Sequence, residues 1–144
     1  LKGEYQLTDA MEHMLKNGVK FYTGQVEEWL DCGNKDATIY TNGRILDIKY
    51  GSNNEIAPTA TITNSVIIPP CYIGEGVHVS NSVIGPLASL EKGVKVSDSR
   101  ITNSIIQADT IVKNACIDNS MLGKSVIYTK KAAELSLGDF STEQ

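Results

Sequence analysis

The chain has 144 residues, enough for one compact domain or two small ones, and its formal net charge is −4 at pH 7. This acidic balance argues against a nucleic-acid partner, which would need a basic surface. No apolar run reaches the ~20 residues of a membrane-spanning helix, so no membrane partner is expected either. The three cysteines, Cys32, Cys71 and Cys116, have no paired spacing, which is typical of a reducing compartment. We therefore expect a cytoplasmic protein.

The first fifty residues predict a small α/β unit. A helix is expected to begin at Asp9, which would cap it, with Glu12 in the first turn and an end at Asn17-Gly18. Short strands are expected at 19–22 and 26–30, followed by an acidic loop and a second helix over about 35–46. The polar stretch that follows predicts a linker at 51–55.

From residue 56 onward an aliphatic residue returns every five or six positions. The returns are Ile56, Ile62, Ile67, Ile73, Val79, Ile84, Leu90, Val96, Ile101, Ile106, Val112, Ile117, Leu122 and Ile127. A residue no larger than valine stands two positions before each later return. These small residues are Ala60, Ser65, Cys71, Val77, Ser82, Ala88, Val94, Ser99, Ser104, Thr110, Ala115, Ser120 and Ser125. A short fixed period of this kind predicts a stacked β-helix.

Residues two apart in a strand share a face, so each small residue and the aliphatic after it are predicted to point inward. Three short strands close one coil. Its interior is narrow, so one of the two inward residues of each strand must be small. The returns then give coils of 17, 17, 16 and 16 residues, with a fifth starting at Leu122. Corners are marked by Thr63-Asn64-Ser65, Ser80-Asn81-Ser82, Thr102-Asn103-Ser104 and Asp118-Asn119-Ser120. Asparagine tolerates the positive φ that tight corners need.

This pattern resembles the hexapeptide repeat, and the resemblance implies a mainly β chain with a left-handed parallel β-helix over 56–128 and a tail over 129–144. The residue before each return is predicted to point outward. The first face would carry Thr61, His78, Lys95 and Ile111, the second Val66, Val83, Arg100 and Cys116, and the third Tyr72, Ser89, Ile105 and Met121. The last two faces stack apolar groups in register, which is typical of an interface.

Two motifs in the first half resemble those of the sugar-1-phosphate nucleotidyltransferases, the family of the glucose-1-phosphate thymidylyltransferases and uridylyltransferases. The run from Gly3 to Asp9 looks like E-x-(E/Q)-(I/L)-T-D, and the run from Trp29 to Gly33 looks like W-x-D-x-G. Long members of that family carry a left-handed β-helix after these motifs. The resemblance covers nearly all of the chain and implies that residues 1–50 are the C-terminal remnant of a catalytic domain.

The resemblance also implies roles for three residues. Asp31 would hold a catalytic Mg²⁺ together with a second Asp, Glu4 would contact sugar hydroxyls, and Trp29 would line the sugar site. The reaction would be attack by a sugar-1-phosphate on the α-phosphate of an NTP, giving a nucleotide sugar and pyrophosphate. Because two anionic phosphates must approach each other, a metal held by carboxylates is required.

The Gly-rich nucleotide loop, the second metal Asp and the E-K-P segment of that family are absent from the sequence. We therefore expect no complete catalytic set and no cofactor in this chain alone. Mg²⁺, the NTP and the sugar-1-phosphate would belong to the intact enzyme, and the isolated chain would be inactive. The β-helix would serve assembly or regulation, with its second or third face packed on another subunit of a homo-oligomer or on the catalytic domain. Cover from within the same chain is the alternative.

Other interpretations stay open at this point. Asp31 could cap the following helix, and Trp29 could be a core aromatic. His78 invites comparison with hexapeptide-repeat acyltransferases, which often use a His as base. Its equivalents one coil away, Thr61 and Lys95, indicate an outward polar face instead. A third possibility is a non-catalytic oligomerisation module.

Overall fold

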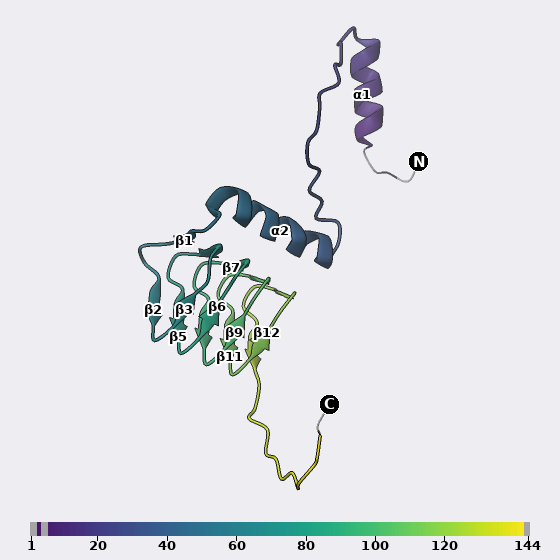
Figure 1. The fold of residues 1–144 in the computed structure, drawn as a ribbon. Coiled ribbons are helices and arrows are strands. Elements are labelled where there is room, and N and C mark those ends of the chain that lie inside the picture. Colours follow the sequence, from purple (N-terminus) through teal and green to yellow (C-terminus); the bar gives the residue numbers. More distant parts are fainter. Residues whose placement is uncertain (1–2, 4–5, 143–144) are drawn as a thin grey trace.

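A stack of short parallel strands forms the main body of the molecule (Figure 1). The computed structural model describes Gly3 and residues 6–142. In this part of the chain two helices precede the strands, α1 at Leu7–Lys16 and α2 at Lys35–Tyr50. The strands wind into a β-solenoid of about 4 turns. The predicted mainly β class is confirmed, and the solenoid is consistent with a left-handed parallel β-helix.

Each sheet of the solenoid takes one strand from each coil. The third face is a sheet of β1 (Asn54–Ile56), β4 (Cys71–Ile73), β7 (Ala88–Leu90), β10 (Ile105–Ile106) and β13 (Met121–Leu122). The first face consists of β2 (Thr61–Thr63), β5 (His78–Ser80), β8 (Lys95–Ser97), β11 (Ile111–Lys113) and β14 (Ile127–Thr129). The second face consists of β3 (Val66–Ile67), β6 (Val83–Ile84), β9 (Arg100–Ile101) and β12 (Cys116–Ile117).

The register of the strands follows the sequence repeat. Ile56 pairs with Ile73 and Ile73 with Leu90, each 17 residues on, and the next two steps to Ile106 and Leu122 are 16 residues long. The aliphatic returns from Ile73 to Ile117 are all 6% exposed or less. The predicted coil lengths and the predicted inward positions are therefore confirmed through the middle of the solenoid.

The last coil departs from the predicted register. Val112 pairs with Tyr128, so Ile127 points outward and is 74% exposed. Val126 takes the inward place predicted for Ser125, and its N–H donates to the hydroxyl of Thr110 (3.1 Å). The prediction was wrong here because it relied on packing from both sides, and in the described residues no further coil stacks on this one.

The small inward serines hold the corners together as well as leaving room. The Ser82 hydroxyl donates to the carbonyl of Ser80 (2.7 Å) and accepts from the N–H of Ser99 in the next coil (3.0 Å). The same pair of bonds recurs at Ser65, Ser99 and Ser104. Each hydroxyl therefore satisfies two main-chain groups where the chain leaves the sheet, a role that reasoning from residue size alone missed.

The corner asparagines adopt the left-handed conformation that their sequence pattern predicts. Asn64 and Asn81 have φ values of 46° and 47°, and Asn103 and Asn119 have values of 40° and 45°. Their amides also stack along the solenoid, because Asn64 Nδ2 donates to Asn81 Oδ1 (2.8 Å) and Asn103 Nδ2 donates to Asn119 Oδ1 (3.4 Å). The prediction of asparagine corners is confirmed.

Helix α2 covers the third face of the solenoid (Figure 1). The side that meets the sheet is formed at helical spacing by Ile39, Asn42, Gly43 and Leu46. Asn42 Oδ1 accepts from the Ser89 hydroxyl (2.7 Å), and Gly43 has no side chain where Leu87 approaches. The cover from within the chain is partial, because Ser89 is 9% exposed whereas Tyr72 and Met121 on the same face are each 38% exposed.

The strands predicted at 19–22 and 26–30 are wrong. These residues, all of which the structure describes, form no strand and run as an extended segment between α1 and α2 (Figure 1). A strand needs a neighbouring strand to take its backbone hydrogen bonds, and the described part of the chain places none beside this segment. The described part of the first fifty residues is therefore two helices and a connector, with no sheet.

Both helices differ from prediction at one end. α1 begins at Leu7, so Asp9 lies inside the first turn, and the N-cap is Gln6, which makes no side-chain cap bond. α2 continues to Tyr50 because no glycine or proline stands between Leu46 and Gly51, whose φ of 56° ends the helix. Neither of these helices is long and apolar enough to span a membrane, and none other exists in the described residues.

Candidate functional site

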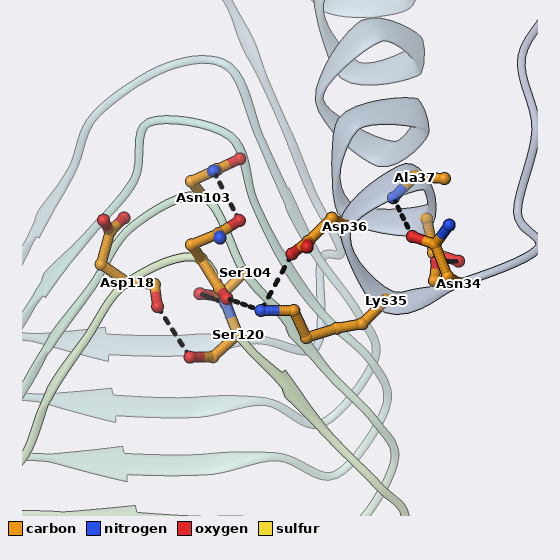
Figure 2. Close-up of polar contacts among 10 residues, drawn as sticks. Asn34, Lys35, Asp36, Ala37, Asn103, Ser104, Asp118 and Ser120 are labelled. Atoms are coloured by element: carbon orange, nitrogen blue, oxygen red, sulfur yellow. Dashed lines mark hydrogen bonds and ion pairs between the residues drawn. The ribbon is translucent and has the colours of Figure 1, made fainter.

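The start of α2 is fixed to a corner of the solenoid (Figure 2). Asn34 Oδ1 accepts from the N–H of Ala37 (2.9 Å), so Asn34 is the helix cap and the alternative role of Asp31 as that cap is wrong. Lys35 Nζ pairs with Asp36 (3.0 Å) and also donates to the carbonyl of Asn119 (3.2 Å). Asn34 therefore sets where the helix begins, and Lys35 links its first turn to the solenoid corner.

The W-x-D-x-G segment, residues 29–33, comes directly before this helix and is held against it. The Thr41 hydroxyl donates to the main-chain carbonyl of Asp31 (2.6 Å). The Thr38 hydroxyl lies 3.2 Å from the carbonyl of Cys32 and 2.8 Å from that of Asn34. A side of α2 that does not touch the solenoid thus carries the motif.

The Asp31 carboxylate is exposed and has one oxygen already engaged. Its Oδ1 accepts from the N–H groups of Cys32 (2.7 Å) and Gly33 (3.1 Å). No hydrogen bond to Oδ2 occurs in the described part of the chain. Two main-chain donors on one oxygen fix the orientation of the carboxylate, so the second oxygen is presented in a defined direction.

An ion pair holds the same segment on the other side of Trp29. Arg44 donates through Nε and Nη2 to the two carboxylate oxygens of Glu28 (2.8 and 3.1 Å), and its Nη1 donates to Asp47 (3.1 Å). The hydrogen bonds from Arg44 lower the pKa of Glu28 below its ordinary value, and the same pairing raises the pKa of Arg44. A pair this open to solvent adds little stability, but a two-pronged contact of this kind fixes direction.

The other residues singled out from the sequence lie as follows. Trp29 is 82% exposed, so it is not a core aromatic in this chain. Glu4 lies outside the described residues. His78 is exposed on β5 between Thr61 and Lys95, on the outward polar face that the repeat predicts.

A single carboxylate meets only part of what Mg²⁺ needs. Mg²⁺ takes one or two protein carboxylates and completes its octahedral shell with waters and phosphate oxygens. Asp31, with one oriented and one open oxygen, fits as one such ligand. Within residues 6–142 no group of three His, Cys, Asp or Glu side chains is placed to hold a metal ion. The remaining ligands would have to come from other groups.

A groove of about 510 Å³ runs along α2 on the side where it meets the solenoid corner. Its walls are Asp36, Ile39, Tyr40, Gly43, Arg44, Asp47, Leu87, Asn103 and Asn119. Arg44 lines this groove and also binds Glu28, so the groove and the motif segment share one side chain.

Sequence reasoning missed Thr41 and Arg44, which bind Asp31 and Glu28. They stand three positions apart in a helix and therefore lie on one side of it. The apolar positions Ile39 and Leu46, at helical spacing, mark a different side. Apolar residues also occur away from the sheet, at exposed Ile45 and Ile48, so the apolar pattern of the sequence did not indicate which side would bind the motif.

The comparison with known proteins agrees with the motifs. No family model matches the chain. The chain is 28% identical over 160 aligned residues to a glucose-1-phosphate thymidylyltransferase from Streptomyces antibioticus, and the alignment covers 97% of this chain and 45% of that enzyme. The chain thus spans less than half the length of its curated relative. Along nearly all of its length, this chain is similar to a sugar-1-phosphate nucleotidyltransferase.

Proposed function

We propose that this chain is part of an enzyme that transfers a nucleotidyl group from an NTP to a sugar-1-phosphate, releasing pyrophosphate. The observation that carries the proposal is the similarity to a thymidylyltransferase over 97% of the chain, which includes the exposed, anchored Trp29–Gly33 motif. On this proposal residues 1–50 belong to the catalytic domain, 51–55 link it to the β-helix of 56–128, and 129–144 form a tail. The free thiols of Cys32, Cys71 and Cys116 fit a cytoplasmic location.

Each motif residue has a defined task in this proposal. Asp31 supplies one carboxylate ligand to Mg²⁺, and bound Mg²⁺ neutralises charge on the reacting phosphates. The exposed indole of Trp29 stacks beside the sugar, and Glu4 accepts hydrogen bonds from sugar hydroxyls. The second carboxylate and the nucleotide loop would come from the rest of the catalytic domain, so the 144 residues alone would be inactive.

We also propose that the solenoid assembles the enzyme through its second face. On this face Val66 is 57% exposed, Val83 is half-buried, and Arg100 and Cys116 are exposed. In the described chain no helix packs on these residues as α2 packs on part of the third face. A homo-oligomer joined through the second face would remove the stacked apolar groups from water.

The test of the proposed reaction is pyrophosphate release by the full-length enzyme with Mg²⁺, each NTP and each common sugar-1-phosphate. One pair should react, and Asp31→Asn should reduce kcat by about 100-fold or more, because one metal ligand is weakened. Asp139→Asn, in the exposed tail, is the matched control and should change nothing. Absence of release with every pair, together with acyl transfer from an acyl-CoA, would show that the protein is an acyltransferase instead.

A further inference from the structure

One side of helix α2 packs on the solenoid and another side binds the motif segment, so the helix connects the two. Ile39, Asn42, Gly43 and Leu46 meet the sheet, whereas Thr38, Thr41 and Arg44 meet residues 28–34. Ile39 and Leu46 are 1% and 3% exposed, so the first side is well packed. The segment bound to the second side is therefore attached, through α2, to the packed solenoid.

Of the two threonine hydroxyls on the second side, only that of Thr41 donates to the motif without a competing acceptor in the described residues. A hydroxyl has one proton to donate. The hydroxyl of Thr38 has two carbonyls within reach, and the nearer, at 2.8 Å, belongs to Asn34, the N-cap of the same helix. The hydroxyl of Thr41 has a single described partner, the Asp31 carbonyl at 2.6 Å.

The ion pair of Glu28 with Arg44 complements this bond at the other end of the motif. Glu28 lies just before Trp29, and Asp31 lies two residues after it, so the main chain at Trp29 lies between two anchors on α2. The two anchors differ in kind. The ion pair is screened by salt, whereas the hydroxyl-to-carbonyl bond is not.

We propose that Thr41 is a positioning residue that fixes the main chain at Asp31, and with it the direction of the Asp31 carboxylate and the Trp29 indole. The importance of this direction for catalysis rests on the proposed function. The anchoring itself does not, because it can be measured on the 144-residue chain in the absence of any substrate.

The first measurement uses Trp29, the only tryptophan of the chain, as a reporter two residues from Asp31. Thr41→Val keeps the shape of the side chain and removes the hydroxyl, while Thr41→Ser keeps the hydroxyl. The valine variant should show lower fluorescence anisotropy of Trp29 and faster amide hydrogen exchange across residues 28–33. The serine variant and the surface control Thr61→Val should match the wild type. Unchanged anisotropy and exchange in Thr41→Val would overturn the anchoring.

The second measurement uses the full-length enzyme and separates kcat from KM. If Thr41 orients a metal-binding carboxylate, Thr41→Val should lower kcat about tenfold or more and leave the KM for the sugar-1-phosphate nearly unchanged. Thr41→Ser should restore kcat. A loosened Trp29 with unchanged kcat would overturn the catalytic part of the proposal. An enzyme without pyrophosphate release would refute the proposed function, while the anisotropy result would still decide the anchoring.

Discussion

Replacing Ser104 with leucine should destabilise the solenoid far more than placing a leucine on its surface. Ser104 is 0% exposed, donates to the carbonyl of Thr102 (2.6 Å) and accepts from the N–H of Ser120 (3.0 Å). Leucine would leave that N–H without a partner, at about 1–3 kcal/mol, and would overpack the coil by about another 1–3 kcal/mol. The expected loss in the free energy of unfolding is therefore about 2–6 kcal/mol.

The measurement is urea unfolding followed by far-UV circular dichroism, because the single tryptophan lies outside the solenoid. With an m value of about 1–3 kcal/mol per molar urea, the midpoint should fall by about 1 M or more. Ser104→Ala isolates the hydrogen-bond loss and should fall between wild type and Ser104→Leu. Lys95→Leu, at an exposed strand position, should stay within about 0.5 kcal/mol of wild type. Equal shifts for Ser104→Leu and Lys95→Leu would refute the inward register of the serines.

Three further outcomes are expected. Arg44→Met should raise the pKa of Glu28 towards its ordinary value, as followed by NMR titration. Pairing with Arg44 lowers this pKa in the folded chain. The stabilising effect of the pair is therefore present above the unfolded-state pKa and disappears as the pH falls through the folded-state pKa. Cys71 is buried and burial raises the pKa of its thiol, so under native conditions it should react with a thiol reagent much more slowly than the two exposed cysteines, and equal rates for all three would contradict its inward place. Val83→Asp should shift the full-length protein to smaller species in light scattering while circular dichroism stays unchanged; a wild-type protein that is monomeric at high concentration would disprove assembly through the second face.

The solenoid was predictable because two inward positions repeat with a fixed separation. Packing from both sides makes each return, such as Ile84 or Ile101, obey that spacing. At Ile127 the spacing alone favoured the wrong residue, since the last coil packs from one side only and Tyr128 can turn in instead. Sequence periodicity therefore predicts the middle of a solenoid better than its ends.

The candidate site was predictable only in part. A motif can indicate Asp31, but the bond from Thr41 to its carbonyl depends on how the loop folds back over ten residues, and no periodicity encodes that. The strands expected at 19–22 and 26–30 failed for a related reason. Strand propensity is local, whereas the partner that completes a strand is not.

The length of α2 matches the height of the stack of strands beneath it, although the helix and the strands are different segments of the sequence. With 16 residues, α2 is about 24 Å long, and the five strands of the third face, stacked about 4.8 Å apart, span about 19 Å. Two contacts tie the helix to the stack, Asn42 to Ser89 and Lys35 to Asn119. One more coil between Ser89 and Asn119 would move Asn119 away from Lys35 by about 4.8 Å, the rise of about three helical residues. An added coil would therefore break one of these two contacts unless α2 also lengthened by about one turn.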